Sequence, residues 1–128
     1  TPIRYLNKGF QQKSLMGFFR NSRIGLVTPL RDGMNLVAKE YIAAQRASDP
    51  GVLILSRFAG AAEELPDALI VNPHDPEGVA NALNYALKMP KKERLRRWLN
   101  AFDQLHSFNI NIWRTHYIEA LETSIITK

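Results

Sequence analysis

The chain has 128 residues, of which 45% are hydrophobic and 23% charged, and it contains no cysteine. This composition is that of one ordinary globular domain, and the lack of cysteine excludes a disulfide framework, a zinc site with cysteine ligands and a thiol nucleophile. No apolar run approaches the roughly 18 to 20 residues that a membrane-spanning helix needs, so we expect a cytoplasmic protein without a membrane partner.

The formal net charge of +5 at pH 7 arises from the first 23 residues. These hold five basic residues and no acid, whereas the rest of the chain balances 12 bases with 12 acids. We interpret the first segment as a surface that faces an anionic partner or a small ligand. A second basic cluster, at 88–97, is broken by Glu93 and is interpreted as a solvated helix face. Neither cluster carries a DNA-binding motif or interleaved aromatic residues, so nucleic acid is not an expected partner.

The first 71 residues contain short apolar runs that predict strands separated by helices. Four such runs occur, at 3–6, 24–27, 52–55 and 68–71. The last three are continuous rather than alternating, which is typical of strands covered on both faces of a parallel sheet. Helices are predicted between the strands, at 11–21 and 36–46. The alternation of strand and helix indicates βαβ units with right-handed crossovers.

From residue 72 onward the pattern is helical. Asp75 is a predicted N-cap, because Pro76 follows it in a favoured first helical position. Two further amphipathic stripes run over 95–105 and 110–121, with a predicted break at 107–111. Because two Trp-bearing helical stripes after only four strands need something to cover, we expect the chain to be the end of a larger α/β protein.

The segment most informative about function leads from the run at 24–27 into the helix predicted at 36–46. It contains Gly33, which lets the backbone approach a ligand closely, and Asn35, which can cap the helix. Ligands of open α/β sheets bind outside the carboxyl ends of the strands, where this loop is expected. The first helical N–H groups lack intrahelical partners and lie at the positive end of the helix dipole. This end of the helix therefore suits a phosphate.

Two carboxylates flank this predicted phosphate site. Asp32 precedes the helix and Glu40 lies about a turn inside it. An ionised carboxylate accepts two hydrogen bonds at once, which matches the vicinal hydroxyls of a sugar, so the arrangement favours a sugar nucleotide. The spacing leaves open that Asp32 is only a turn residue and Glu40 an exposed helical acid. A glycosidase pair is disfavoured, because it needs a second acid across the scissile bond and this segment supplies none.

Four blocks of the chain resemble the trehalose-6-phosphate synthases. The segment GLVTPLRDGMNLVAKEY at 25–41 matches that family's donor-binding motif nearly letter for letter. Three further blocks follow in the family's order, PGVLILS at 50–56, FAGAAEEL at 58–65 and ALIVNP at 68–73. The resemblance implies an α/β fold, namely part of the Rossmann-like C-terminal domain of a GT-B glycosyltransferase, with parallel strands, covering helices and a helical C-terminal tail.

The resemblance also implies an activity, that of a retaining glycosyltransferase of trehalose biosynthesis. Such an enzyme moves glucose from UDP-glucose to glucose 6-phosphate and produces trehalose 6-phosphate. Carried over to this chain, Asp32 holds hydroxyls of the transferred glucose and Glu40 holds the ribose diol. The other donor-binding residues that the resemblance implies are Gly33, Met34 and Asn35 at the glucose, the backbone of Leu36 and Val37 at the pyrophosphate, Ala38 and Lys39 in the same run, and Phe10 and Leu15 at the uracil. Phe10 is equally compatible with a core aromatic.

The resemblance places other parts of the enzyme outside this chain. The family's phosphate-neutralising Arg and Lys, its acceptor-phosphate arginine and its active-site His precede residue 1, so we expect these 128 residues alone to be inactive. Residues 1–90 are predicted to form a portion of the nucleotide-sugar-binding domain, and 91–128 to pack back toward the missing N-terminal domain. The small-residue turn at 58–62 is interpreted as allowing close helix packing beside the donor pocket.

Cofactors and partners follow from the same comparison. No metal or other cofactor is expected, and the histidines are interpreted as surface or interface residues: His74, His106 and His116. Homo-oligomerisation stays open. Two alternatives to the main interpretation also stay open, a glucosylglycerol-phosphate synthase of the same superfamily and a non-catalytic regulatory homologue. The acceptor residues lie outside this chain, so only overall resemblance favours the trehalose-6-phosphate synthase.

Overall fold

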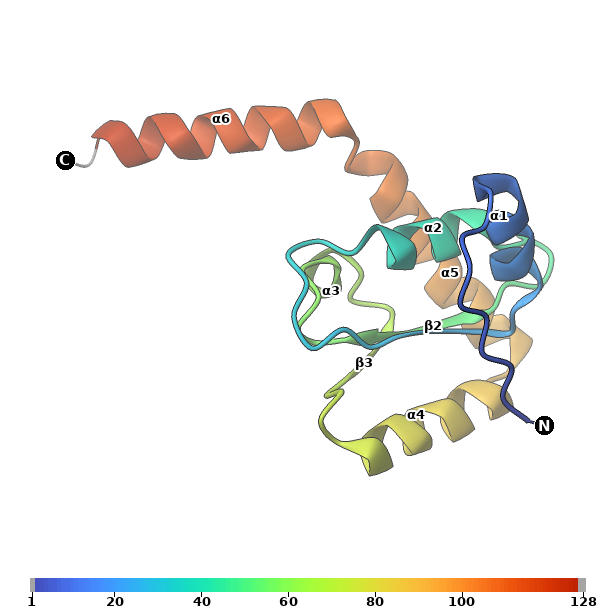
Figure 1. The fold of residues 1–128 in the computed structure, drawn as a ribbon. Helices are drawn as coiled ribbons and strands as arrows, with labels where there is room; N and C mark the ends of the chain where they lie inside the picture. Colours follow the sequence, from blue (N-terminus) through green and yellow to red (C-terminus); the bar gives the residue numbers. More distant parts are fainter. Residues whose placement is uncertain (1, 127–128) are drawn as a thin grey trace.

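The chain folds into a small parallel sheet covered by helices (Figure 1). The computed structural model describes residues 2–126. The elements in chain order are α1 (Gln12–Asn21), β1 (Ile24–Val27), α2 (Leu36–Ala44), β2 (Val52–Ser56), α3 (Ala61–Glu64), β3 (Leu69–Val71), α4 (Pro76–Lys88), α5 (Lys91–Ser107) and α6 (Ile110–Ile126). The strands lie in the order β1-β2-β3, and both neighbouring pairs are parallel.

The central strand β2 divides the core into two clusters. Because alternate residues of a strand point to opposite faces, Leu53 and Leu55 pack with α2 and α5 on one face, whereas Val52 and Ile54 pack with α4 on the other. All five residues of β2 are buried, which confirms a strand covered on both faces. The outer strands are less covered, since Leu26 of β1 is 45% exposed.

The apolar run at 3–6 forms no strand, so the prediction of four strands is wrong. Ile3 and Tyr5 are 80% and 83% exposed, and no strand among the described residues pairs with this segment. A strand is stabilised by its cross-strand pairs. Without such a partner, a short apolar run gains little from the extended conformation.

In the second half of the chain, the observed helix ends agree with two predictions made from the sequence. The Asp75 carboxylate accepts a hydrogen bond from the Gly78 N–H at 3.0 Å, which confirms it as the N-cap of α4. Helix α5 ends at Ser107 and α6 begins at Ile110, which confirms the break predicted at 107–111.

The two C-terminal helices differ in how they contact the rest of the chain. Helix α5 is part of the core, where the Trp98 indole donates to the Ile42 carbonyl oxygen at 3.0 Å. Buried Arg94 of the same helix forms an ion pair with Asp49 at 2.7 Å. Helix α6 projects away from the sheet (Figure 1), and Trp113 on it is 43% exposed. None of the described helices is long and apolar enough to cross a membrane.

Candidate functional site

The candidate loop, residues 28–35 between β1 and α2, lies at the carboxyl edge of the sheet beside the loop that follows β2 (Figure 1). Three backbone hydrogen bonds join the two loops. The Asp32 N–H donates to Phe58 O at 3.1 Å, and the Gly60 N–H donates to Asp32 O at 2.9 Å. The Ala61 N–H donates to Met34 O at 2.7 Å. The candidate loop therefore occupies the edge at which open α/β sheets bind ligands.

The carboxylate of Asp32 is held inside this loop. Its Oδ1 accepts from the Met34 N–H at 3.0 Å, and its Oδ2 accepts from the Asn35 side-chain amide at 2.9 Å. These hydrogen bonds, that of Met34 first, lower the pKa of Asp32 because they stabilise the charged form. An ionised carboxylate offers about four acceptor positions, so Asp32 keeps acceptor capacity for ligand hydroxyls. The turn role and the ligand role, which the spacing left open as alternatives, are compatible in one residue.

Asn35 fixes the start of α2. Its backbone is left-handed, with φ 78° and ψ 89°, and its side-chain oxygen accepts from the Ala38 N–H at 2.9 Å, which confirms the predicted N-cap. The N–H groups of Leu36 and Val37 lie in the same first turn and have no intrahelical acceptor. Both residues are exposed, at 61% and 43%. This end of α2 is therefore open to an anion.

The remaining residues of the predicted donor-binding run divide between core and surface. Ala38 is fully buried, and the Lys39 ammonium forms an ion pair with Glu64 of α3 at 2.5 Å. Both residues therefore stabilise the packing of α2. Glu40 is half-buried and has no ion pair among the described residues, so its carboxylate is available to a ligand.

Phe10 and Leu15 lie on the α1 side of the structure. Phe10 precedes α1, and its half-buried ring meets the Phe18 ring edge-on with centroids 5.2 Å apart. The Lys8 ammonium lies 5.2 Å from the centroid of the same ring. Leu15 is half-buried on α1, which packs against α2. No hydrogen bond or ring contact among the described residues joins Phe10 to the candidate loop, so the ligand and core interpretations of Phe10 both stand.

Two hollows border the candidate loop. The first, of about 320 Å³, is formed by the two loops at the carboxyl edge. Its lining includes Arg31, Asp32, Gly33, Arg57 and Glu63. The second, of about 240 Å³, is mostly apolar and lies where the start of α2 faces the start of α6. Its lining includes Met34, Leu36, Ile110 and Trp113.

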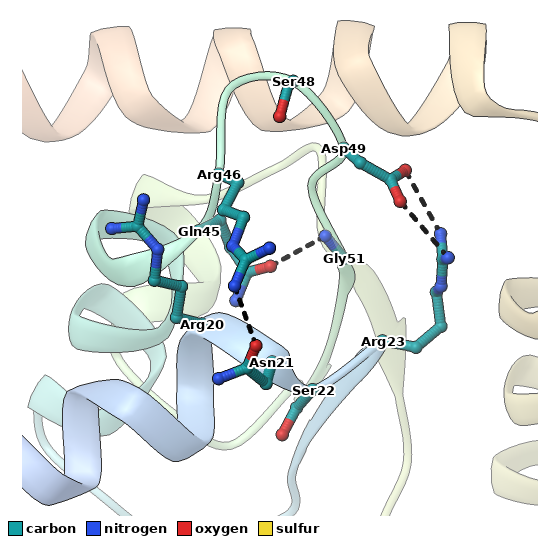
Figure 2. A pocket seen from close by; sticks show the side chains of 9 residues that line it. All are labelled: Arg20, Asn21, Ser22, Arg23, Gln45, Arg46, Ser48, Asp49 and Gly51. Carbon is teal, nitrogen blue, oxygen red and sulfur yellow. Dashed lines mark hydrogen bonds and ion pairs between the residues drawn. The ribbon is translucent and has the colours of Figure 1, made fainter.

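A third hollow lies at the opposite edge of the sheet, where β1 and β2 begin (Figure 2). Three arginines line it, Arg20, Arg23 and Arg46. The Arg46 guanidinium donates to the Asn21 side chain at 2.9 Å, and that of Arg23 donates to Asp49 at 3.4 Å. Helices α1 and α2 both end here, and cations near helix C-termini stabilise the terminal carbonyl groups. We interpret the residues of this basic hollow as structural, because they hold the helix ends and the neighbouring loop together, rather than as a ligand site.

No sequence pattern indicated the buried polar contact of Gln45, which lines this hollow. Gln45 is 7% exposed; its amide nitrogen donates to Phe19 O at 2.7 Å, and its oxygen accepts from the Gly51 N–H at 2.8 Å (Figure 2). The small-residue turn at 58–62 was expected beside the donor pocket, but its hydrogen bonds to the candidate loop were not predicted. A glycine among small residues at 58–62 was the available signal for that second contact.

The histidines lie against aromatic rings. The pairs are His74 with Phe58, His106 with Phe102 and His116 with Phe108. Within residues 2–126, no group of three or more His, Cys, Asp or Glu side chains is arranged to hold a metal ion.

The structure is a parallel α/β sheet with the candidate loop at its carboxyl edge, and the comparisons with known proteins give the family. Residues 1–123 match the family described as glycosyltransferase family 20, and the chain belongs to it. A trehalose-6-phosphate synthase from Enterobacter sp. (strain 638) is 57% identical over 122 residues, which is 95% of this chain and 26% of that protein. The chain therefore spans about a quarter of the length of the relatives it matches.

The chain is also similar in structure to solved proteins with trehalose-phosphate names. An E. coli trehalose-6-phosphate structure bound with UDP-2-fluoro glucose is 56% identical, has a TM-score of 0.89 and covers 94% of this chain and 27% of its own. An α,α-trehalose-phosphate synthase (UDP-forming) from Burkholderia xenovorans, in complex with glucose-6-phosphate, is 52% identical with a TM-score of 0.89, over 95% of this chain and 27% of its own. These likenesses confirm the expected α/β fold of a GT-B glycosyltransferase.

Proposed function

We propose that the protein to which this chain belongs is an α,α-trehalose-phosphate synthase. It transfers glucose from UDP-glucose to glucose 6-phosphate with retention, and this chain supplies the donor-binding part. The observation that carries the proposal is the pair of carboxylates, Asp32 and Glu40, on either side of the open N-terminus of α2. Identities above 50% to relatives with a UDP-sugar analogue or glucose-6-phosphate bound support it.

The two carboxylates bind different sugars of the donor. The free acceptor positions of Asp32 take hydroxyls of the transferred glucose, and the exposed residues Gly33 and Met34 line the same sugar. Asn35 lines the glucose site as well. Glu40 accepts from the two ribose hydroxyls one turn further along α2.

The phosphates and the base lie between and beyond these carboxylates. The N–H groups of Leu36 and Val37 bind the pyrophosphate at the positive end of the helix dipole. The backbone of Phe10 and the side chain of Leu15 border the uracil. The basic character of the first 23 residues attracts the anionic donor toward this side.

The chemistry that this chain must supply is positioning and charge stabilisation. The bond between glucose C1 and the UDP oxygen breaks, and a hydroxyl oxygen of glucose 6-phosphate bonds to C1 on the same face. The proton of that hydroxyl passes to the leaving phosphate, so this chain supplies no general base. The helix N-terminus stabilises the charge that develops on the leaving phosphate. As the resemblance implies, neither a metal nor another cofactor takes part.

The other partner of this chain is the rest of the same protein. Residues 1–90 form a portion of the nucleotide-sugar-binding domain, and α6 carries exposed apolar residues that a preceding domain covers. These residues include Ile110, Trp113, Tyr117 and Leu121. We place the protein in the cytoplasm, and its oligomeric state stays open.

A coupled UDP-release assay on the full-length protein tests the proposal. UDP-glucose is supplied with either glucose 6-phosphate or glycerol 3-phosphate. Fast release with glucose 6-phosphate alone is the expected result. Preference for glycerol 3-phosphate would instead identify the glucosylglycerol-phosphate synthase, and no release with either acceptor would favour the regulatory homologue.

A further inference from the structure

The segment Asp32-Gly33-Met34 is held in place by the loop after β2. Its backbone makes three hydrogen bonds to residues 58–61, at 3.1, 2.9 and 2.7 Å. Residues 32 and 59 also pair as an isolated parallel bridge, so the two loops extend the sheet beyond β1 and β2. The conformation of the sugar-facing segment therefore depends on its neighbour as well as on its own turn.

Gly60 is the point of closest approach between the two loops. A Cβ built on Gly60 would overlap the Gly33 carbonyl oxygen and lie 2.9 Å from the Gly33 carbonyl carbon. The backbone of Gly60 is helical, with φ −56° and ψ −33°, a conformation open to any residue. The requirement for glycine at this position is therefore one of space, set by the Gly33 backbone.

The loop after β2 is the more firmly anchored of the two. Ser56, Ala59 and Ala61 are each at most 1% exposed. The Ser56 hydroxyl accepts from the Phe58 N–H at 3.1 Å, and the Ala59 N–H donates to Ser56 O at 3.1 Å. Gly33 in contrast is exposed, and nothing lies within 4 Å of a Cβ built on it. A side chain added at residue 60 would therefore displace the candidate loop rather than its own loop.

The part of α2 that carries Glu40 has separate anchors. Tyr41 is 1% exposed and donates its hydroxyl to Ser22 O at 3.0 Å, and Ile42 is 4% exposed in the core. The hydrogen bonds of Tyr41 with Ser22 and of Trp98 with Ile42 lie on the α1 and α5 side of the helix, and residues 58–61 take no part in them. Displacement of residues 32–34 would therefore leave the position of Glu40 unchanged.

We propose that Gly60 is a positioning residue for the transferred sugar, and that it acts on residues 32–34 without moving the Glu40 carboxylate that holds the ribose. The proposal rests on the proposed function, because it assigns residues 32–34 to glucose and Glu40 to ribose. Gly60 touches no substrate itself. It permits the close contact that sets the distance from the Asp32 carboxylate to the glucose hydroxyls.

The test compares Gly60→Ala with the wild type in the full-length protein. Two quantities are measured, the affinity for UDP by calorimetry and kcat for transfer from UDP-glucose. We expect a fall in kcat of roughly ten- to a hundredfold, the scale of loss from a misplacement of about 1 Å, and a much smaller change in UDP affinity, because Glu40 stays in place. Gly78→Ala on α4 is the matched control, because its Cβ would crowd the Asp75 carboxylate at 2.5 Å, on the opposite face of the sheet. It should leave both quantities unchanged.

A second variant keeps the proposal testable if Gly60→Ala does not fold. Ala59→Gly loosens the same loop without adding bulk, and it should give a smaller fall in kcat with unchanged UDP affinity. Unchanged kcat in both variants would overturn the proposal. A parallel loss of kcat and UDP affinity would also overturn it, because Gly60 would then support the whole site.

Failure of the proposed function gives a different result. In that case the wild type itself releases no UDP from UDP-glucose with glucose 6-phosphate as the acceptor. Amide hydrogen exchange at Asp32 and Met34, whose N–H groups are hydrogen-bonded, then still tests the structural step, since Gly60→Ala should accelerate exchange there and leave that of Tyr41 and Ile42 unchanged. Unaltered exchange at Asp32 and Met34 would contradict the positioning role without reference to activity.

Discussion

The side-chain amide of Asn35 joins two functions, because it donates to the Asp32 carboxylate at 2.9 Å while its oxygen accepts from the Ala38 N–H, also at 2.9 Å. One residue thus begins α2 and orients the carboxylate that precedes it. Its left-handed backbone, φ 78°, lets the side chain reach both partners. The helix end that suits a phosphate and the carboxylate that suits a sugar are therefore set by the same side chain.

Replacement of Asn35 should separate its backbone role from its side-chain role. Asn35→Gly keeps the left-handed backbone and loses the cap, whereas Asn35→Ala loses both. We expect Asn35→Ala to unfold more easily than Asn35→Gly by about 1 to 2 kcal/mol, the cost of a left-handed Cβ. Urea unfolding of the chain measures the difference. Equal stability of the two variants would mean that the left-handed conformation carries no strain.

The Trp98 indole should contribute measurably to the stability of the core. It is 7% exposed, and its N–H donates to Ile42 O at 3.0 Å. Trp98→Phe removes this hydrogen bond, while Ile42 O keeps the one from the Gln45 N–H at 3.3 Å, so we expect a loss of about 0.5 to 1.5 kcal/mol in the free energy of unfolding. Trp113→Phe on α6 is the control, since Trp113 is 43% exposed and should change stability little. A larger effect at Trp113 would show that α6 belongs to this core.

Glu93 should contribute to acid sensitivity. The guanidinium of Arg96, and then that of Arg97, lower the pKa of Glu93 from its ordinary value of 4.5 to about 2. A pKa that is lower in the folded state gives stability that is present above pH 4.5 and is lost as the pH falls toward 2.

Glu93→Gln therefore should lower stability at neutral pH and flatten the loss of stability between about pH 5 and 2. Denaturant unfolding over this pH range measures the slope. Glu77→Gln is the control, because Glu77 is exposed and has no ion pair among the described residues. Identical slopes for wild type and Glu93→Gln would contradict the role of the pair.

Much of the fold could be predicted from local signals. The continuous run at 52–55 is the two-sided strand β2, and Asp75 with Pro76 begins α4. The run at 3–6 is interrupted by Arg4 and forms no strand. The difference lies in the presence of a partner strand, which local sequence does not contain.

The candidate site was predictable for a different reason. Asp32, Gly33 and Asn35 are local to one loop, and their turn and cap chemistry follows from residue type. The ion pair of Lys39 with Glu64 and the contact of Gly60 with Gly33 join residues about 25 positions apart. Such contacts depend on how two loops meet in space, and the pattern of either loop alone does not indicate them.

The 128-residue chain alone should not make trehalose 6-phosphate. It holds the proposed donor contacts, but the proposed acceptor site and the cations that neutralise the donor phosphates lie in the rest of the protein. Incubation of the purified chain with UDP-glucose and glucose 6-phosphate, with the full-length protein as positive control, should give no product. Turnover by the chain at the full-length rate would show that these residues suffice.

UDP binding by a Glu40 variant tests the donor assignment most directly. Isothermal calorimetry of UDP binding compares the full-length wild type with Glu40→Ala, and Glu77→Ala serves as a control acid outside the site. Loss of a charged acceptor for the ribose hydroxyls should weaken UDP binding by about 1.5 to 3 kcal/mol, while Glu77→Ala binds as the wild type does. Unchanged UDP affinity in Glu40→Ala would contradict the ribose assignment and with it the proposed donor site.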